Sequence, residues 1–140
     1  KIPLPVDISI SADDQRLWVD TWNDGKARLF DISNPHAPRQ IYEKKIGDQI
    51  NMISQSWDGD RAYFTSSLLY NWDKVEGSPG DVQYFKAYTW NGSELKHQFS
   101  IDFTAEKLGR PHQMRFGAYS LYSEGPNKPQ RELIADLKAQ

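Results

Sequence analysis

A stretch of twelve residues occurs twice in this chain at a constant offset of 45 positions, and this repeat limits the fold more than any other feature. Residues 8–19 read ISISADDQRLWV and residues 53–64 read ISQSWDGDRAYF, so an isoleucine, two serines, an aspartate and an arginine coincide. A repeat of about this period is typical of a supersecondary unit that stacks against copies of itself. We therefore expect two copies of one unit.

Each copy has the sequence pattern of four short strands. The first strand ends in serine, a turn follows at Asp13–Asp14 or Asp58–Gly59, and the next strand starts at arginine; aspartate and glycine tolerate the backbone angles of tight turns. The remaining strands are expected at residues 27–32, 39–43, 82–88 and 95–103. Four strands at this period predict an all-β fold in which residues 1–116 form about two four-stranded blades of a β-propeller, with units near 4–46 and 50–103.

A single β-sandwich of eight strands also fits the alternating pattern, but a sandwich has no reason to repeat its Ser-x-Ser-x-Asp turn. Two blades alone leave broad sheet faces uncovered, and repeat arrays generally need three or more units. The chain opens inside a strand pattern at Leu4, without an initiator methionine or a signal peptide. We therefore expect the remaining blades to come from a preceding part of the protein.

Charge and composition exclude several classes of function. The chain has 17 basic and 19 acidic residues, so it has no basic field that would attract nucleic acid. Its longest apolar stretches, such as residues 68–70, are too short to span a membrane. It has no cysteine, which excludes disulfides, thiolate metal sites and thiol nucleophiles within this chain.

Three segments carry a resemblance to a known family. They are VDISISADD at residues 6–14 with FDISNP at 30–35, TSSLLYNWDK at 65–74, and IDF at 101–103 with LG at 108–109 and PHQMRF at 111–116. In these segments the chain resembles the selenium-binding proteins, whose bacterial members include methanethiol oxidase. Gln113 stands where the animal members have glutamate, and AYSLY at 118–122 replaces their Gly-Gly-Asp-Cys segment, which favours the C-terminal part of a bacterial member.

The resemblance implies a seven-bladed propeller with copper-dependent oxidase activity in sulfur metabolism. Methanethiol, oxygen and water would give formaldehyde, hydrogen sulfide and hydrogen peroxide, and this chain alone would be inactive. Bacterial members imply a periplasmic location, with the cytoplasm as the alternative. A homo-oligomer is left open. The alternative function is a non-catalytic propeller that binds a protein or a small ligand through its channel face.

His112 is the candidate copper ligand. It lies in the sequence GRPHQ, a loop directly after the last expected strand, and loops at blade ends line the mouth of a propeller channel. Imidazole is a usual ligand for copper, and His112 matches a histidine of the family. The plainer interpretation is a loop histidine bonded to the backbone. His97 is expected on the buried side of its strand and His36 in an exposed turn, so the other copper ligands would come from outside this chain.

The insertion at residues 70–81, between the second and third strands of the second unit, is expected to form a pocket rim because it is rich in glycine and proline. Asp73 is the candidate catalytic residue, which would orient a metal-bound histidine or a proton carrier; a turn or cap role is its plainer interpretation. The candidate rim residues are Trp72, Lys74, Arg110 and Arg115.

The end of the chain and the tryptophans leave alternatives open. Residues 117–140 are expected to form a loop, and Leu133 and Leu137 share one face at helical spacing, so a short C-terminal helix could follow and dock on the propeller or on a second subunit. The five tryptophans lie mostly in or beside strands, where packing is their ordinary role. A tryptophan-derived cofactor is the alternative.

Overall fold

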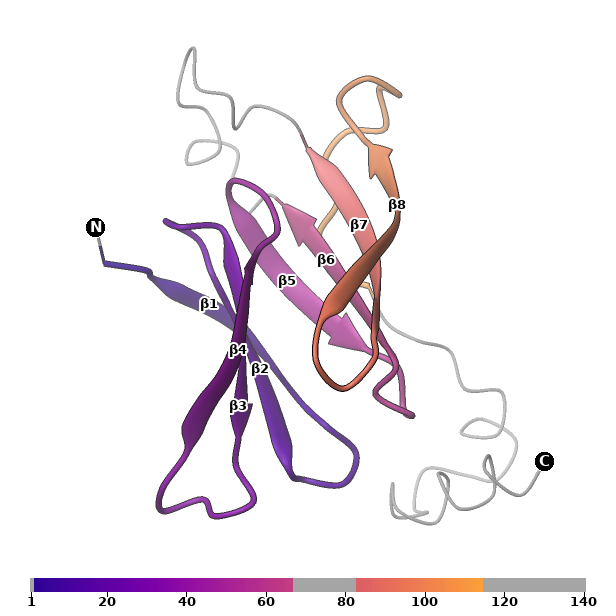
Figure 1. Cartoon of the computed structure of the whole chain (residues 1–140). Coiled ribbons are helices and arrows are strands. Elements are labelled where there is room, and N and C mark those ends of the chain that lie inside the picture. Colours follow the sequence, from indigo (N-terminus) through magenta and orange to yellow (C-terminus); the bar gives the residue numbers. More distant parts are fainter. Residues whose placement is uncertain (1, 67–82, 115–140) are drawn as a thin grey trace, which may run out of the picture.

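The structure, a computed structural model, describes residues 2–66 and 83–114. The predicted site residues Trp72, Asp73, Lys74 and Arg115 and the expected tail therefore lie outside the described residues. The described segments form two four-stranded antiparallel sheets, each with its strands in sequence order (Figure 1). The first contains β1 (Pro5–Ile10), β2 (Arg16–Thr21), β3 (Lys26–Asp31) and β4 (Arg39–Lys45), and the second contains β5 (Ile50–Gln55), β6 (Arg61–Ser66), β7 (Tyr84–Trp90) and β8 (Leu95–Asp102).

The repeated turns make the same hydrogen bonds in both sheets. The Ser11 hydroxyl accepts a bond from the Arg16 backbone N–H at 2.9 Å and donates to Asp13, and Ser56 does the same with Arg61, at 3.0 Å, and Asp58. Asp14 and Gly59, 45 positions apart, both have left-handed backbones, with φ of 57° and 76°. The predicted two-unit architecture is confirmed. The two turns are equivalent in their hydrogen bonds as well as in their sequence.

The two sheets stand side by side with their first strands aligned. The Ile53 N–H donates to Asp7 Oδ2 at 3.0 Å, and Gln55 Nε2 donates to Ser9 Oγ at 2.9 Å, so β5 follows β1 in parallel. The hairpin turns β1–β2, β3–β4, β5–β6 and β7–β8 consequently share one end, which we call the turn end (Figure 1). The connections β2–β3, β4–β5 and β6–β7 share the other end, which we call the insertion end because residues 67–82 join β6 to β7 there.

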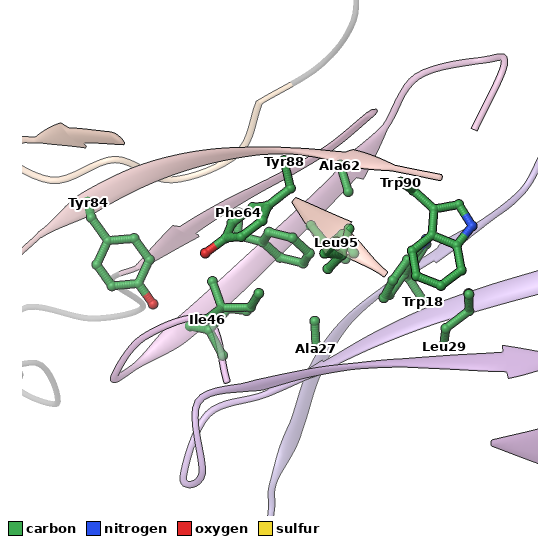
Figure 2. Close-up of a cluster of buried hydrophobic side chains, with 12 residues drawn as sticks. Trp18, Ala27, Leu29, Ile46, Ala62, Phe64, Tyr84, Tyr88, Trp90 and Leu95 are labelled. Carbon is green, nitrogen blue, oxygen red and sulfur yellow. The ribbon is translucent and has the colours of Figure 1, made fainter. Parts of the chain in front are cut away.

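An aromatic core fills the space between the sheets. Trp18 of the first sheet meets Trp90 of the second edge to face, with ring centroids 5.4 Å apart, and Phe64 lies 6.5 Å away. Such pairs contribute about 0.5–1.5 kcal/mol beyond the area that they bury. Figure 2 shows Trp18 and Trp90 at one end of this core and Tyr84 at the other. Packing is thus the role of the two tryptophans in the core.

The two outer faces of the pair of sheets are apolar and uncovered. On β1, Ile8 and Ile10 alternate with the residues that face β5 and are 57% and 51% exposed. On the far side of the second sheet, Phe85 stacks with Tyr63 at 5.4 Å and with Phe99 at 5.8 Å, and Phe99 is half exposed. These faces have the character that was expected of blades that pack against neighbouring blades.

The predicted orientation of His97 is only partly correct. His97 does share the core-facing side with Leu95, because they pair with Tyr88 and Trp90 on β7. A one-residue irregularity in the register then moves Phe99 to the opposite face, and β8 is the outer strand of its sheet. His97 is therefore exposed rather than half-buried, with its Nε2 2.7 Å from the Ser100 hydroxyl.

Candidate functional site

His112 is placed at the insertion end by its own backbone. After β8 the chain turns back, and the His112 carbonyl accepts a hydrogen bond from the Thr65 hydroxyl of β6. The Met114 carbonyl accepts one from Ser54, which stands 45 positions after Ser9, the residue that holds β5 against β1. Residues 112–114 thus lie beside β5 and β6.

The His112 side chain is exposed, and Arg110 lies in the exposed stretch before it. Pro111 between them is buried, which fixes the path of this segment. Within residues 2–66 and 83–114, no group of three His, Asp or Glu side chains is placed to hold a metal ion. The described part of the chain therefore offers a single imidazole at this position.

The two ends of the insertion are held beside His112. Ser66, the last residue of β6, donates to Gln83 Oε1 at 3.1 Å and accepts the Tyr84 N–H at 2.8 Å, and all three residues are buried. Thr65, which binds the His112 carbonyl, directly precedes Ser66. The described residues that flank the insertion, Ser66 and Gln83, therefore lie close to the His112 segment.

Toward the same end, the buried carboxyl group of Asp20 lies next to the half-buried Asp7, a pairing that the sequence did not predict. Asp20 on β2 is fully buried; its Oδ1 accepts the Asp7 N–H at 2.8 Å, and no donor among the described residues reaches its Oδ2. Burial, followed by the nearby charge of Asp7, raises the pKa of Asp20 to about 8. With this pKa, the protonated form of Asp20 is the favoured one at neutral pH.

Two side chains of β7, Tyr84 and Lys86, hold the β4–β5 connection in place near the carboxyl group of Asp20. The Tyr84 hydroxyl donates to the Asp48 carbonyl at 3.0 Å, and the Lys86 ammonium donates to the Ile46 carbonyl at 2.6 Å while it lies 4.4 Å from the centre of the Tyr84 ring. Burial raises the pKa of Tyr84 and lowers that of Lys86. Gly47 lies so close to the Tyr84 ring that an added Cβ would come within 2.8 Å of it.

The signals for these residues were weak in the sequence. Asp20 and Trp18 are two positions apart on β2 and therefore face the same side, so the sequence itself contained an aspartate at a core-facing strand position. Nothing in the sequence showed that Asp7 would approach it, because that contact depends on the register of β1 against β2. At the insertion end, the described residues thus place the exposed His112, the residues that flank the insertion and the buried Asp20, which the sequence did not predict.

Comparison with known proteins identifies the family. A family model described as 56 kDa selenium binding protein (SBP56) matches residues 2–121. The methanethiol oxidase of Ruegeria pomeroyi is 63% identical over 122 residues, which are 87% of this chain and 28% of that protein. The chain therefore spans less than a third of the length of that relative.

Solved structures agree with this family and with the fold. A hypothetical selenium-binding protein from Sulfolobus tokodaii has a TM-score of 0.64 at 32% identity, over 72% of this chain and 26% of that one. The β-propeller domain of Cps50 (Swd1) from Myceliophteria thermophila has a TM-score of 0.52 at 12% identity, over 74% and 30% of the two chains, which supports the fold alone. The two sheets are blades of a β-propeller, and the chain belongs to the 56 kDa selenium-binding protein family.

Proposed function

We propose that the protein containing this chain is a copper-dependent methanethiol oxidase. The observation that carries the proposal is the 63% identity to the Ruegeria pomeroyi methanethiol oxidase over most of this chain. In the proposed reaction, methanethiol, oxygen and water give formaldehyde, hydrogen sulfide and hydrogen peroxide. The carbon of methanethiol is oxidised by two electrons, and oxygen is reduced to peroxide. The proposed location is the periplasm and the proposed context is sulfur metabolism, both from the resemblance.

His112 is the residue of this chain that would hold the metal. When bound, copper would supply a centre that accepts and passes on single electrons, and imidazole is among its usual ligands. The exposed side chain of His112, on a backbone held by Thr65, suits a ligand that completes a site with other residues. We propose that the other ligands come from outside the described residues or from other blades.

The remaining groups at the insertion end would hold protons and shape the pocket. The protonated Asp20 carboxyl, with a pKa of about 8, is the described group that could hold a proton between turnovers. Asp73 is proposed to orient a metal-bound histidine or a proton carrier. Trp72, Lys74, Arg110 and Arg115 are proposed to form the rim. The insertion begins beside Thr65, which supports this assignment of the rim.

The test uses the purified full-length protein. We expect methanethiol to be consumed with equal amounts of hydrogen peroxide and formaldehyde formed, and copper to be present by elemental analysis. The variant His112→Ala should lose copper and turnover together while the melting temperature stays the same, because a loop side chain carries no strand hydrogen bonds. His36→Ala is the matched control, since His36 is exposed in the β3–β4 turn at the opposite end.

Two results would contradict the proposal. If His112→Ala keeps full copper and full turnover, His112 is an ordinary loop histidine. If the wild-type protein forms no peroxide from methanethiol with copper bound, a non-catalytic propeller that binds its ligand through the channel face becomes the better description.

A further inference from the structure

A groove at the turn end lies between the two repeated turns and has no part in the site described above. It encloses about 320 Å³ and is lined by Ser11, Ala12, Asp13, Arg16, Trp18, Gln55, Trp57, Asp58, Gly59 and Trp90. A second hollow of about 670 Å³ continues it toward the β7–β8 turn and shares Arg16, Asp58 and Trp90 with it. Both walls of the groove are formed by described residues of this chain.

Two tryptophans that line this groove have indole N–H groups without an acceptor in the described part of the chain. Trp90 is 7% exposed and Trp57 half-buried, and the Nε1 atoms of both are buried without a hydrogen-bond partner among the described residues. An indole nitrogen can only donate, and a buried donor without a partner costs free energy. In Figure 2 the indole nitrogen of Trp90 points outward from the core. A ligand with hydrogen-bond acceptors would therefore satisfy these two donors.

The groove also offers acceptors and a cation. Asp13 and Asp58 each use Oδ1 for the hydrogen bonds of their own turn, which leaves Oδ2 outside those bonds. The Arg16 guanidinium is exposed between these two turns. The carboxylates disfavour an anionic ligand and the guanidinium disfavours a cationic one, so the lining suits a neutral ligand.

We propose that the turn-end groove binds a neutral sugar of one or two rings. Sugar hydroxyls both donate and accept, so they can bond the two carboxylates as well as the indole and guanidinium N–H groups. The apolar C–H face of a sugar ring can stack on a tryptophan face, as other apolar surfaces do. A volume of about 320 Å³ lies at the lower end of the range for ligand pockets, and the second hollow gives room for another ring.

The experiment measures sugar binding to the full-length protein. The probes are glucose, galactose, mannose, maltose, lactose and cellobiose, tested by saturation-transfer NMR and by tryptophan fluorescence. We expect at least one of them to bind. Trp57→Phe, which keeps an aromatic ring and removes the N–H, should weaken that binding about tenfold, and Arg16→Gln should weaken it by a similar factor. Trp22→Phe is the matched control, because Trp22 is half-buried at the insertion end.

Each outcome decides the proposal. Binding that is lost in Trp57→Phe and Arg16→Gln and kept in Trp22→Phe, with equal melting temperatures, supports it. No binding by any of the six sugars overturns it. Binding that both groove variants retain overturns the location. If glucose 6-phosphate or betaine binds in place of every neutral sugar, the ligand class is wrong. Methanethiol oxidation should stay unchanged in both groove variants, so this test is independent of the proposed function.

Discussion

The buried carboxyl of Asp20 makes the stability of the protein depend on pH in an unusual direction. Its pKa is raised from 3.8 to about 8, so between these values the folded protein holds a proton that the unfolded chain has lost. Stability should therefore be greatest below about pH 4 with respect to this group, and should fall as the pH rises toward 8. At about 1.4 kcal/mol for each of about four pH units, the loss is on the order of 5 kcal/mol.

The variant Asp20→Asn tests this reasoning because asparagine keeps the shape of the protonated acid without its titration. We expect Asp20→Asn to be close to wild type at about pH 4 and more stable by several kcal/mol at pH 9, in urea titrations of the full-length protein. In the wild type, the infrared C=O band of a protonated carboxyl should disappear between pH 7 and 9. This band should be missing from the variant at every pH.

The control is Asp13→Asn in an exposed turn. The hydrogen bond from Ser11 lowers the pKa of Asp13, so its contribution has the opposite sign: it is present at neutral pH and lost as the pH falls. Asp13→Asn should therefore gain nothing at pH 9. If Asp20→Asn and the wild type have parallel stability profiles from pH 5 to 9, Asp20 is ionised in the folded protein and the proton-holding role proposed for it is wrong.

Two further predictions concern the backbone. Gly47→Ala should lower the free energy of unfolding by about 1–3 kcal/mol, because its Cβ would stand 2.8 Å from the Tyr84 ring. Adding Tyr84→Leu to Gly47→Ala should recover part of this loss. If Gly47→Ala leaves the free energy of unfolding unchanged, Gly47 and Tyr84 are not closely packed. Gly59→Ala should cost about 1 kcal/mol through its φ of 76° alone, since no described residue lies within 4 Å of an added Cβ. Gly59→Asp, which copies Asp14 of the first unit, should cost less, and equal melting curves for the two variants would argue against this explanation.

The features that the sequence predicted well depend on neighbours along the chain. Hydrogen bonds between residues two to five positions apart stabilise the Ser11–Asp13–Arg16 turn and its copy in the second unit. Residue types at fixed spacing are therefore enough to recognise these turns. The strands between these turns followed from alternation. Phe99 lies on the face opposite to His97, although alternation along the strand predicts the same face for both, because one extra residue in β8 exchanges the two faces; no residue type in that stretch indicates the irregularity.

The features that the sequence could not predict depend on how distant segments meet. Thr65 reaches the His112 carbonyl across 47 positions, and Asp7 reaches Ile53 across 46. The resemblance to the family selected His112 as a candidate, but only the hydrogen bonds from Thr65 and Ser54 place the backbone of residues 112–114 beside β5 and β6. The indole N–H groups of Trp57 and Trp90, which have no acceptor among the described residues, also depend on how distant segments meet.

The topology also explains why the two proposed sites need not interfere with each other. In a meander, successive connections alternate between the two ends of a blade, so a groove built from the turns at one end does not share residues with a site built from the connections at the other. The aromatic core from Trp18 to Tyr84 lies between them and is close-packed (Figure 2). Arg16→Gln changes an exposed side chain at the turn end, whereas His112→Ala changes one at the insertion end. If the two variants are combined, their effects on sugar binding and on methanethiol oxidation should therefore be additive, and a coupling between them would require the blades to move as the site is used.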